Sequence, residues 1–214
     1  MKSINDELRD AAKAGDAPTL KDLLLRGEGD PLSKNKGGWT ALMIAANKGH
    51  MDCARLLLPA SDPLVQNNAG WTALMMATNG RPDCVQLLLS GSDLLARDNY
   101  GSTALMMAAA CGHAGCVQPL LSGSDALARN DGGLTALMYA AKSGDAACVQ
   151  LLLPVSDCAA RDLKAMAASD YARRGQHADM ADFIDAFAQA QSELSALGSS
   201  TGQGAPRASA PRRL

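Results

Sequence analysis

Residues Gly38 to Ala45 read GWTALMIA, and closely similar octapeptides begin at Gly70, Gly101 and Gly133. Successive copies begin 32, 31 and 32 residues apart. After each octapeptide come a glycine, a Cys-centred apolar stretch and a Ser-Asp pair, which in the first copy is Ser61-Asp62. A fixed period of this length predicts a solenoid in which every period forms one supersecondary unit.

Each repeat is predicted to form two short helices and a loop. A threonine stands where an N-cap belongs, and an Ala, Leu and Met segment of about two turns follows it. The second helix carries apolar residues at i, i+3 and i+4, as at Cys53, Leu56 and Leu57. Helices this short are marginal alone, so they must stack on their neighbours. The capping threonines are Thr40, Thr72, Thr103 and Thr135, and the glycines that end the first helices are Gly49, Gly80, Gly112 and Gly144.

The eleven residues from Thr40 to His50, TALMIAANKGH, resemble the ankyrin repeat motif T-P-L-H-x-A-A-x-x-G-H. Residues Thr103 to His113 match it in the same way, and the resemblance extends over roughly residues 5–190. It implies an all-α ankyrin-repeat solenoid of stacked helix-turn-helix units with β-hairpin-like loops. The chain is therefore identified as a member of this family by resemblance.

The repeats depart from the family motif at three positions. Its proline is Ala at Ala41, Ala73, Ala104 and Ala136, and its histidine is Met at Met43, Met75, Met106 and Met138. The glycine of its closing G-A-D is missing. Because no histidine can bond to the threonine, we expect buried methionine packing to replace that hydrogen bond.

The ends of the array are predicted to be caps. We divide the chain into an N-terminal capping repeat (1–36), four repeats (37–68, 69–99, 100–131 and 132–163), C-terminal capping helices (164–197) and a disordered tail (198–214) with three arginines and no acid. Ser3 is a candidate N-cap. The last helix should be amphipathic, with Met180, Phe183, Ile184 and Phe187 forming its apolar face.

Two irregularities interrupt the array. The Thr72 repeat lacks one residue between Ala77 and Gly80, which predicts a shortened turn between its helices. Pro119 replaces the leucine found at 56, 87 and 151. Because proline lacks an N–H, we expect the second helix there to be kinked or to start late. A straight helix with an unbroken ladder across residues 115–121 would contradict this.

Composition excludes several classes of function. The net charge is −2 and the sequence pI about 5.9, so no general attraction to nucleic acid or anionic membrane is expected. The first residues contain no apolar signal-peptide core, and no run of ~18 apolar residues predicts a membrane span. We therefore expect a cytoplasmic protein, or one in a host cell interior if it is a translocated effector.

No group of residues predicts catalysis or a cofactor. Cys53, Cys84, Cys116 and Cys148 occupy equivalent positions on helices that stack about 8–10 Å apart, too far for disulfides or one zinc ion. They are read as small buried core residues, and Cys111 as a surface thiol. The histidines sit at turns with no nucleophile beside them. We expect no enzyme activity, no cofactor, no metal and no small-molecule substrate.

A column of basic residues leaves two interpretations open. Arg97, Arg129 and Arg161 fall at one position of the repeat, where Lys34 and Gln66 stand in the earlier copies. Each member is followed by Asn or Asp. The column is either a stripe for phosphates or acidic peptides, or a charge-compensated, solvated loop column. We favour the second interpretation. The Ser-Asp aspartates are expected to serve loop hydrogen bonding.

The candidate binding site lies where the repeats differ. In the family, the hairpin tips and inner helices line a concave binding face, and the tips of this chain vary while its motif positions do not. The predicted partner-binding residues are Lys36, Trp39, Lys48, Asn68, Trp71, Asn99, Tyr100, Ser102, Asp131 and Leu134. Exposed Trp and Tyr are typical interface anchors, although Trp39 and Trp71 could instead stack on each other.

These features predict a protein-interaction module that binds a protein of unknown identity, as an adaptor or as an inhibitor or effector. We expect no membrane association, and take a monomer as the default. The alternative is a nucleic-acid-associated regulatory factor that uses the Arg97, Arg129 and Arg161 column with the basic tail. Steep salt dependence of binding would distinguish it.

Overall fold

The threonine of each repeat begins a helix as the sequence predicts. In the computed structural model, which describes residues 3–200, the hydroxyl oxygens of Thr40, Thr72, Thr103 and Thr135 accept hydrogen bonds from the N–H three residues on, at 3.3–3.4 Å. Ser3 caps the first helix in the same manner, with a reciprocal bond from its own N–H to Asp6. Each cap satisfies an N–H that the first turn leaves free.

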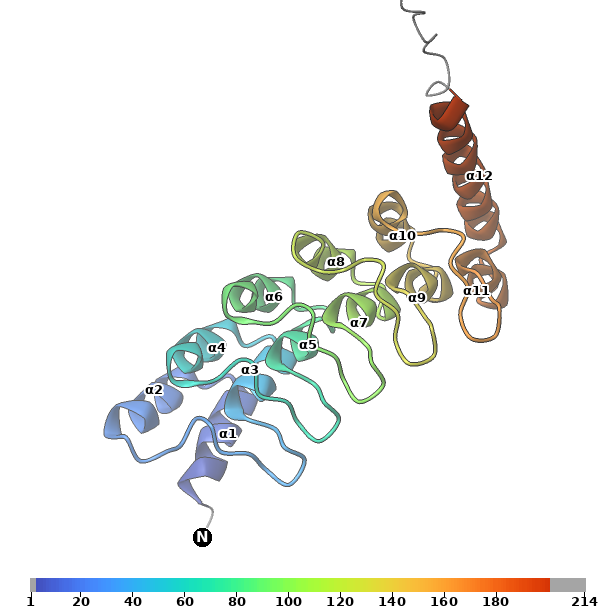
Figure 1. Cartoon of the computed structure of the whole chain (residues 1–214). Coiled ribbons are helices and arrows are strands. Elements are labelled where there is room, and N and C mark those ends of the chain that lie inside the picture. The colour runs from blue at the N-terminus through green and yellow to red at the C-terminus, as the bar shows by residue number, and fades with distance from the viewer. Residues whose placement is uncertain (1–2, 201–214) are drawn as a thin grey trace, which may run out of the picture.

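The described residues form helices in two rows (Figure 1). The inner row is α1 (Ile4–Ala14), α3 (Ala41–Lys48), α5 (Ala73–Ala77), α7 (Ala104–Ala110), α9 (Ala136–Ser143) and α11 (Ala168–Arg174). The outer row is α2 (Ala17–Arg26), α4 (Met51–Leu57), α6 (Pro82–Leu88), α8 (Ala114–Leu120) and α10 (Ala146–Leu152). Loops project from the inner row along one side, and α12 (Ala178–Ser200) closes the far end.

The core is a continuous layer between the two rows. The four methionines that replace the family's histidine are at most 2% exposed: Met43, Met75, Met106 and Met138. Leucines of the outer helices, such as Leu57 and Leu88, are fully buried against them. The prediction that methionine packing fills the histidine position is confirmed. No β-strand is found within residues 3–200, so the stack is an all-α solenoid with hairpin-like loops.

The irregular second repeat shortens its helix rather than its turn. Helix α5 ends at Ala77, and four residues separate it from α6, whereas two separate α3 from α4. The buried Thr78 hydroxyl donates to the Met75 carbonyl at 2.7 Å and closes the early end. The predicted short turn is therefore wrong: the missing residue is lost from the last turn of the helix, where the hydroxyl replaces a backbone donor.

Pro119 does not delay its helix. Helix α8 begins at Ala114, the position equivalent to Ala146 in α10, so the predicted late start is wrong. The proline lies past the first turn, where the missing N–H would face the exposed Gly115 carbonyl. The short 3₁₀ helices that follow α4, α6 and α10 (Leu58–Ala60, Leu89–Gly91 and Leu153–Val155) have no counterpart after α8 among the described residues. The N–H of Ser124 there donates to Leu120.

The C-terminal cap buries most of the predicted apolar face, with Phe183 as the exception. In α12, Ala181 and Ile184 are buried, Met180 and Phe187 are half-buried, and Phe183 is 49% exposed. Small Ala172 is also fully buried on the neighbouring α11, which lets the two helices approach closely. Helix α12 continues to Ser200, three residues past the predicted end of the cap. The rest of the tail, residues 201–214, lies outside the described residues.

Candidate functional site

Each loop of the inner side is a hairpin built on one Asn or Asp. Its side-chain oxygen accepts the N–H groups two and four residues on, at 2.8–3.0 Å. The residues in this role are Asn35, Asn67, Asp98, Asn130 and Asp162. A glycine one residue before the end of the first four hairpins takes a left-handed φ of 74–80°. The hairpins therefore share one frame, whatever side chains their tips carry.

Neighbouring hairpins are tied tip to tip. The N–H of Asn68 donates to the Gly37 carbonyl at 3.1 Å, and the same bond recurs from Asn99 to Ala69 and from Asp131 to Tyr100. The side-chain amides of Asn68 and Asn99 also donate to the preceding tip, at 3.0 and 2.9 Å. These two predicted binding residues are exposed, but their amides also hold the tips together.

A large side chain lies across each hairpin from a small one. A Cβ on Gly37 would lie 2.9 Å from the Trp39 ring, and one on Gly132 would lie 2.8 Å from Leu134. Ala69 and Trp71 form the corresponding pair of the second hairpin. Trp39 and Trp71 are half-buried and pack against the core, so the expectation of exposed tryptophan anchors is wrong. Their rings cover their own hairpins because the residue opposite is small.

The third hairpin reverses this pairing. Its large residue is Tyr100, 71% exposed, and the residue that would cover the hairpin is Ser102, which is 7% exposed. Ser102 is therefore too deeply placed to be the surface contact we expected. Its small side chain leaves a hollow of about 230 Å³. The residues around it are Trp71, Asp98, Tyr100, Ser102, Met106, Met107, Ala110 and Tyr139.

The other predicted binding residues are distributed along the same edge. Lys36 and Asp131 are exposed at the first and fourth tips, Lys48 is exposed in the last turn of α3, and Leu134 is half-buried over its hairpin. Of the predicted binding residues, the structure brings Trp71, Tyr100 and Ser102 together in one hollow. Sequence reasoning missed Tyr139, which follows the T-A-L-M motif at a position where the other copies carry Ile or Met. The variation between repeats at this position could have identified Tyr139 as a candidate binding residue.

The hydroxyls of the two inner-helix tyrosines are held by the hairpin residues. Asn130 donates to the Tyr139 hydroxyl at 3.0 Å, and the Tyr171 hydroxyl donates to Asp162 at 2.6 Å. Burial, followed by the bond to Asp162, raises the pKa of Tyr171 to about 12. The same hydrogen bond lowers the pKa of Asp162. The cap therefore repeats the tyrosine-on-hairpin arrangement found beside the hollow.

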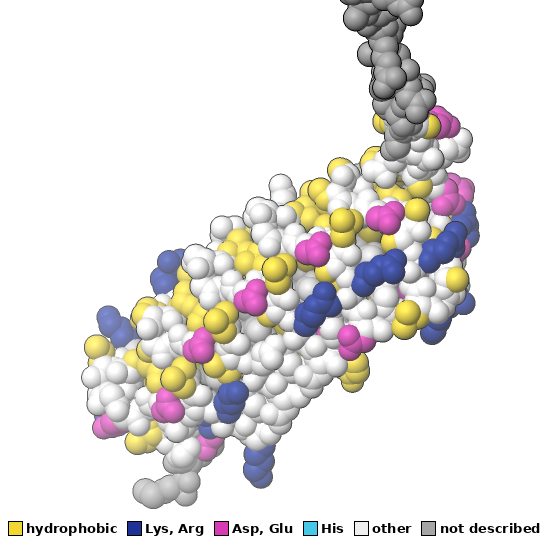
Figure 2. Space-filling model, in the orientation of Figure 1, with side chains coloured by type: hydrophobic (Ala, Val, Ile, Leu, Met, Phe, Trp, Pro, Cys, Tyr) yellow, Lys and Arg dark blue, Asp and Glu magenta, His cyan; other side chains and the backbone are white. Residues whose placement is uncertain are grey.

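The basic column is a ladder of hydrogen bonds between repeats. Arg97 donates to the carbonyl of Arg129 at 2.6 Å, and Arg129 donates to that of Arg161 at 2.9 Å. Lys34 and Gln66 make the equivalent bonds to Gln66 and Arg97. The Asn or Asp that follows each member accepts hydrogen bonds from its own hairpin. Figure 2 shows the row of basic side chains with a row of acidic ones beside it.

The aspartates of the Ser-Asp pairs form the hydrogen bonds expected of them. Asp62, Asp93, Asp125 and Asp157 each accept the N–H two residues on at 2.9 Å. The serine before each aspartate behaves differently. The hydroxyl oxygens of Ser61, Ser92, Ser124 and Ser156 are buried without a hydrogen-bond partner among the described residues. This column is therefore held by the carboxylates and not by the hydroxyls.

The cysteine column lies in the core, as predicted. Cys53, Cys84, Cys116 and Cys148 are at most 1% exposed, and Cys111 is exposed. Burial raises the pKa of the four core thiols, that of Cys148 to about 12. At neutral pH these thiols are protonated and therefore poor nucleophiles. Within residues 3–200, no three His, Cys, Asp or Glu side chains gather to hold a metal ion.

The histidines cover glycines of the preceding turn. A Cβ on Gly15 would lie 2.7 Å from the His50 ring, and His113 and His177 lie similarly over Gly80 and Gly144. His50 also contacts the Lys13 carbonyl through Nε2 at 3.1 Å. These contacts agree with the structural turn role that the motif implies.

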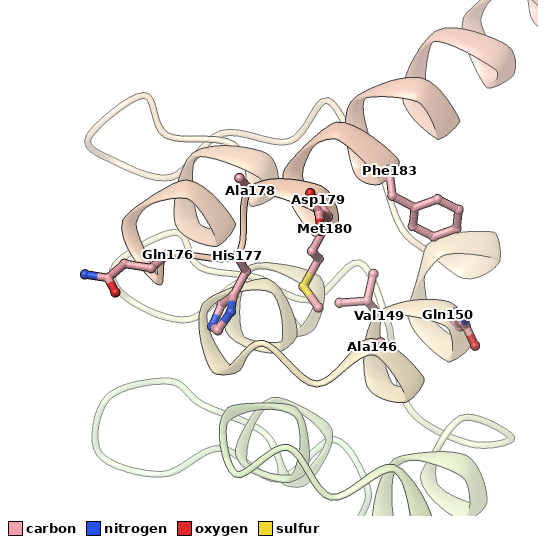
Figure 3. A pocket seen from close by; sticks show the side chains of 9 residues that line it. All are labelled: Ala146, Val149, Gln150, Gln176, His177, Ala178, Asp179, Met180 and Phe183. Carbon is pink, nitrogen blue, oxygen red and sulfur yellow. The ribbon is translucent and has the colours of Figure 1, made fainter.

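A larger groove of about 580 Å³ lies between α10 and the start of α12 (Figure 3). Met180 points toward Val149 on its floor, while His177 and Phe183 stand at opposite ends. Sequence reasoning missed this groove, because it depends on which face α12 turns toward the stack. Among the described residues, no helix is long and apolar enough to cross a membrane.

Comparison with known families agrees with this architecture. The family model described as ankyrin repeats (3 copies) matches residues 8–98 and again residues 90–164. The matched region contains the second half of α1, helices α2 to α10 and all four hairpins with variable tips, and it amounts to well over half of the chain. The chain therefore belongs to the ankyrin repeat family.

Proposed function

We propose that this chain binds a protein partner on its tip surface, which we define as the four variable hairpin tips with the adjoining inner helices. Ankyrin repeats are generally protein-interaction modules and typically not enzymes. One observation supports a binding site on this surface. Hydrogen bonds common to every hairpin fix the frame, while the tip side chains vary from Lys36 and Trp39 to Asn99 and Asp131. A rigid frame with variable side chains supports binding at low ordering cost.

The predicted contact residues differ in how much of each side chain is exposed to a partner. Tyr100, Lys36, Lys48 and Asp131 are exposed and offer side chains to a partner directly. Trp39, Trp71 and Leu134 contribute partly covered apolar surface, and Asn68 and Asn99 keep the tips aligned. The module would serve as an adaptor that holds a partner, or as an inhibitor that covers the partner's active or binding surface.

The nucleic-acid alternative has less support. Arg97 and Arg129 each use guanidinium N–H groups to bind the carbonyl of the next repeat. This gives the basic column a role in joining the repeats, and no separate observation favours phosphate binding.

The test is affinity capture from a lysate of the native cells, quantified by mass spectrometry. Tyr100→Ala removes the most exposed ring of the tip surface without opening the core, and Lys36→Glu reverses an exposed charge. Gln86→Ala on α6 and Gln118→Ala on α8 are matched exposed changes on the outer helices. We expect one set of captured proteins to be lost with the tip variants and retained with the outer ones. Loss with the outer variants alone would place binding on the other side.

A further inference from the structure

The hollow at Ser102 combines two departures from the repeat pattern. Ser102 replaces the large residue that stands at Trp39, Trp71 and Leu134, and so leaves a space. Asp98 replaces the asparagine of the other three variable-tip hairpins, Asn35, Asn67 and Asn130. Asparagine forms the same hairpin bonds at 2.9–3.0 Å, so the hairpin itself does not require a carboxylate here. The added charge therefore needs another explanation.

Aromatic rings surround the space. Trp71 comes from the preceding hairpin, Tyr100 from the hollow's own hairpin and Tyr139 from helix α9. The Trp71 indole donates to Asp98 at 3.2 Å, and Asn130 holds the Tyr139 hydroxyl at 3.0 Å, so two of the three rings are oriented by hydrogen bonds. Met106, Met107 and Ala110 of α7 supply apolar surface. The hollow is thus preformed in the unliganded chain.

The chemistry of this lining favours a cation. Ring faces attract a guanidinium or an ammonium, more strongly as water is excluded. Asp98 accepts three N–H groups, all from neutral donors, and forms no ion pair within residues 3–200. None of the eight lining residues is basic. The methionine and alanine surface suits the methylene stem of a long basic side chain.

We propose that the hollow between Trp71, Tyr100 and Tyr139 receives one arginine or lysine side chain of the protein partner, with its charge facing Asp98. The inference rests on the proposed function and narrows the partner to a protein that presents an exposed basic residue to the tip surface. Arginine should bind more tightly than lysine, because its planar guanidinium can stack on a ring while bonding to a carboxylate.

The test is a titration of the ¹⁵N-labelled full chain with N-acetyl-arginine amide and N-acetyl-lysine amide, followed by NMR. The indole N–H of Trp71, identified with Trp71→Phe, reports on the hollow directly because it bonds to Asp98. N-acetyl-leucine amide and N-acetyl-glutamine amide serve as neutral probes. We expect saturable shifts of this indole with the two basic amides, and none of comparable size with the neutral ones.

Two Asp→Asn variants form a matched pair. Asp98→Asn removes the charge beside the hollow and restores the residue of the other tips. The two hairpin bonds to Oδ1 should persist, while the bond from the Trp71 indole is lost because an amide nitrogen cannot accept it. Asp83→Asn removes an exposed charge from helix α6 of the outer row, and it does not line the hollow. We expect Asp98→Asn to weaken binding of the arginine amide by on the order of fivefold and Asp83→Asn to change it little. Ser102→Leu, which copies Leu134, should fill the hollow and abolish binding.

Each other outcome overturns the proposal. Equal shifts with leucine amide would identify an apolar hollow without preference for charge. An equal loss in both Asp→Asn variants would show a diffuse negative field, and no shift with any amide would show that the hollow takes no such side chain. The capture experiment distinguishes failure of this inference from failure of the proposed function. If a partner is lost with Tyr100→Ala but still captured by Asp98→Asn, the tip surface binds the partner and only the basic-residue inference fails.

Discussion

At the scale of single residues, the same side-chain bond does the same task in every copy. The hairpin Asn or Asp, the capping threonine and the Ser-Asp aspartate each bind the backbone within four residues. Local hydrogen bonds of this kind depend on sequence spacing, so the threonine caps and the Ser-Asp bonds could be predicted from the repeat. The hairpin bonds of the Asn or Asp were missed, although they follow the same spacing. The serine column is the exception, because its hydroxyls are buried without a partner among the described residues.

Ser92→Ala should stabilise the chain. Ala keeps the shape of the site and removes a buried hydroxyl that has no protein partner, so we expect the free energy of unfolding to rise by about 1 kcal/mol. The measurement is urea denaturation followed by circular dichroism. Ser90→Ala, two residues earlier and exposed, is the control and should change stability by less than about 0.5 kcal/mol. A clear loss of stability in Ser92→Ala would mean that the hydroxyl makes a useful bond.

At the scale of elements, the stack tolerates irregularities within single helices. The second repeat gives up the last turn of α5, and α8 accepts Pro119 without changing its start. Neighbouring helices define where each helix must begin, so packing overrides the local preference that predicted a late start. The cost of the proline is then the hydrogen bond that α8 cannot form.

Pro119→Leu should therefore stabilise α8. Leucine is the residue at positions 56, 87 and 151, and its N–H can bond to the Gly115 carbonyl. We expect the free energy of unfolding to rise by about 1–3 kcal/mol, measured by urea denaturation. The reverse change, Leu151→Pro in the regular helix α10, should lower it by about 3 kcal/mol. Unchanged stability in Pro119→Leu would mean that the missing bond costs nothing at this site.

At the scale of the whole molecule, contacts run mainly between adjacent units. Each inner helix packs on the next, and α12 covers the end of the stack through α11. Stability in such an array is approximately a sum of unit and interface terms. A destabilising substitution at one end should therefore lower the local stability of nearby repeats more than that of distant ones.

Ile184→Ala tests this directly. Ile184 is 1% exposed in α12, and losing its side chain should cost about 2–5 kcal/mol locally. Native-state hydrogen exchange should show protection lost most in α11 and α9, and least in α1 and α3. Phe183→Ala, the half-exposed neighbour, is the control and should have a smaller effect. Equal loss of protection in all helices would show that the chain unfolds as one cooperative unit.

The sequence alone determined the repeat period, the paired helices, the caps of the inner helices and the strip of variable tips, because each depends on contacts within a few residues or on an exact repeat. Only the tertiary structure decided how the tips are covered. Whether Trp71 is exposed depends on the small residue across its hairpin, and whether Tyr139 meets Ser102 depends on how two repeats stack. The ring-lined hollow beside Asp98 belongs to no single repeat. It arises where three successive repeats meet, since Trp71, Ser102 and Tyr139 come from neighbouring copies.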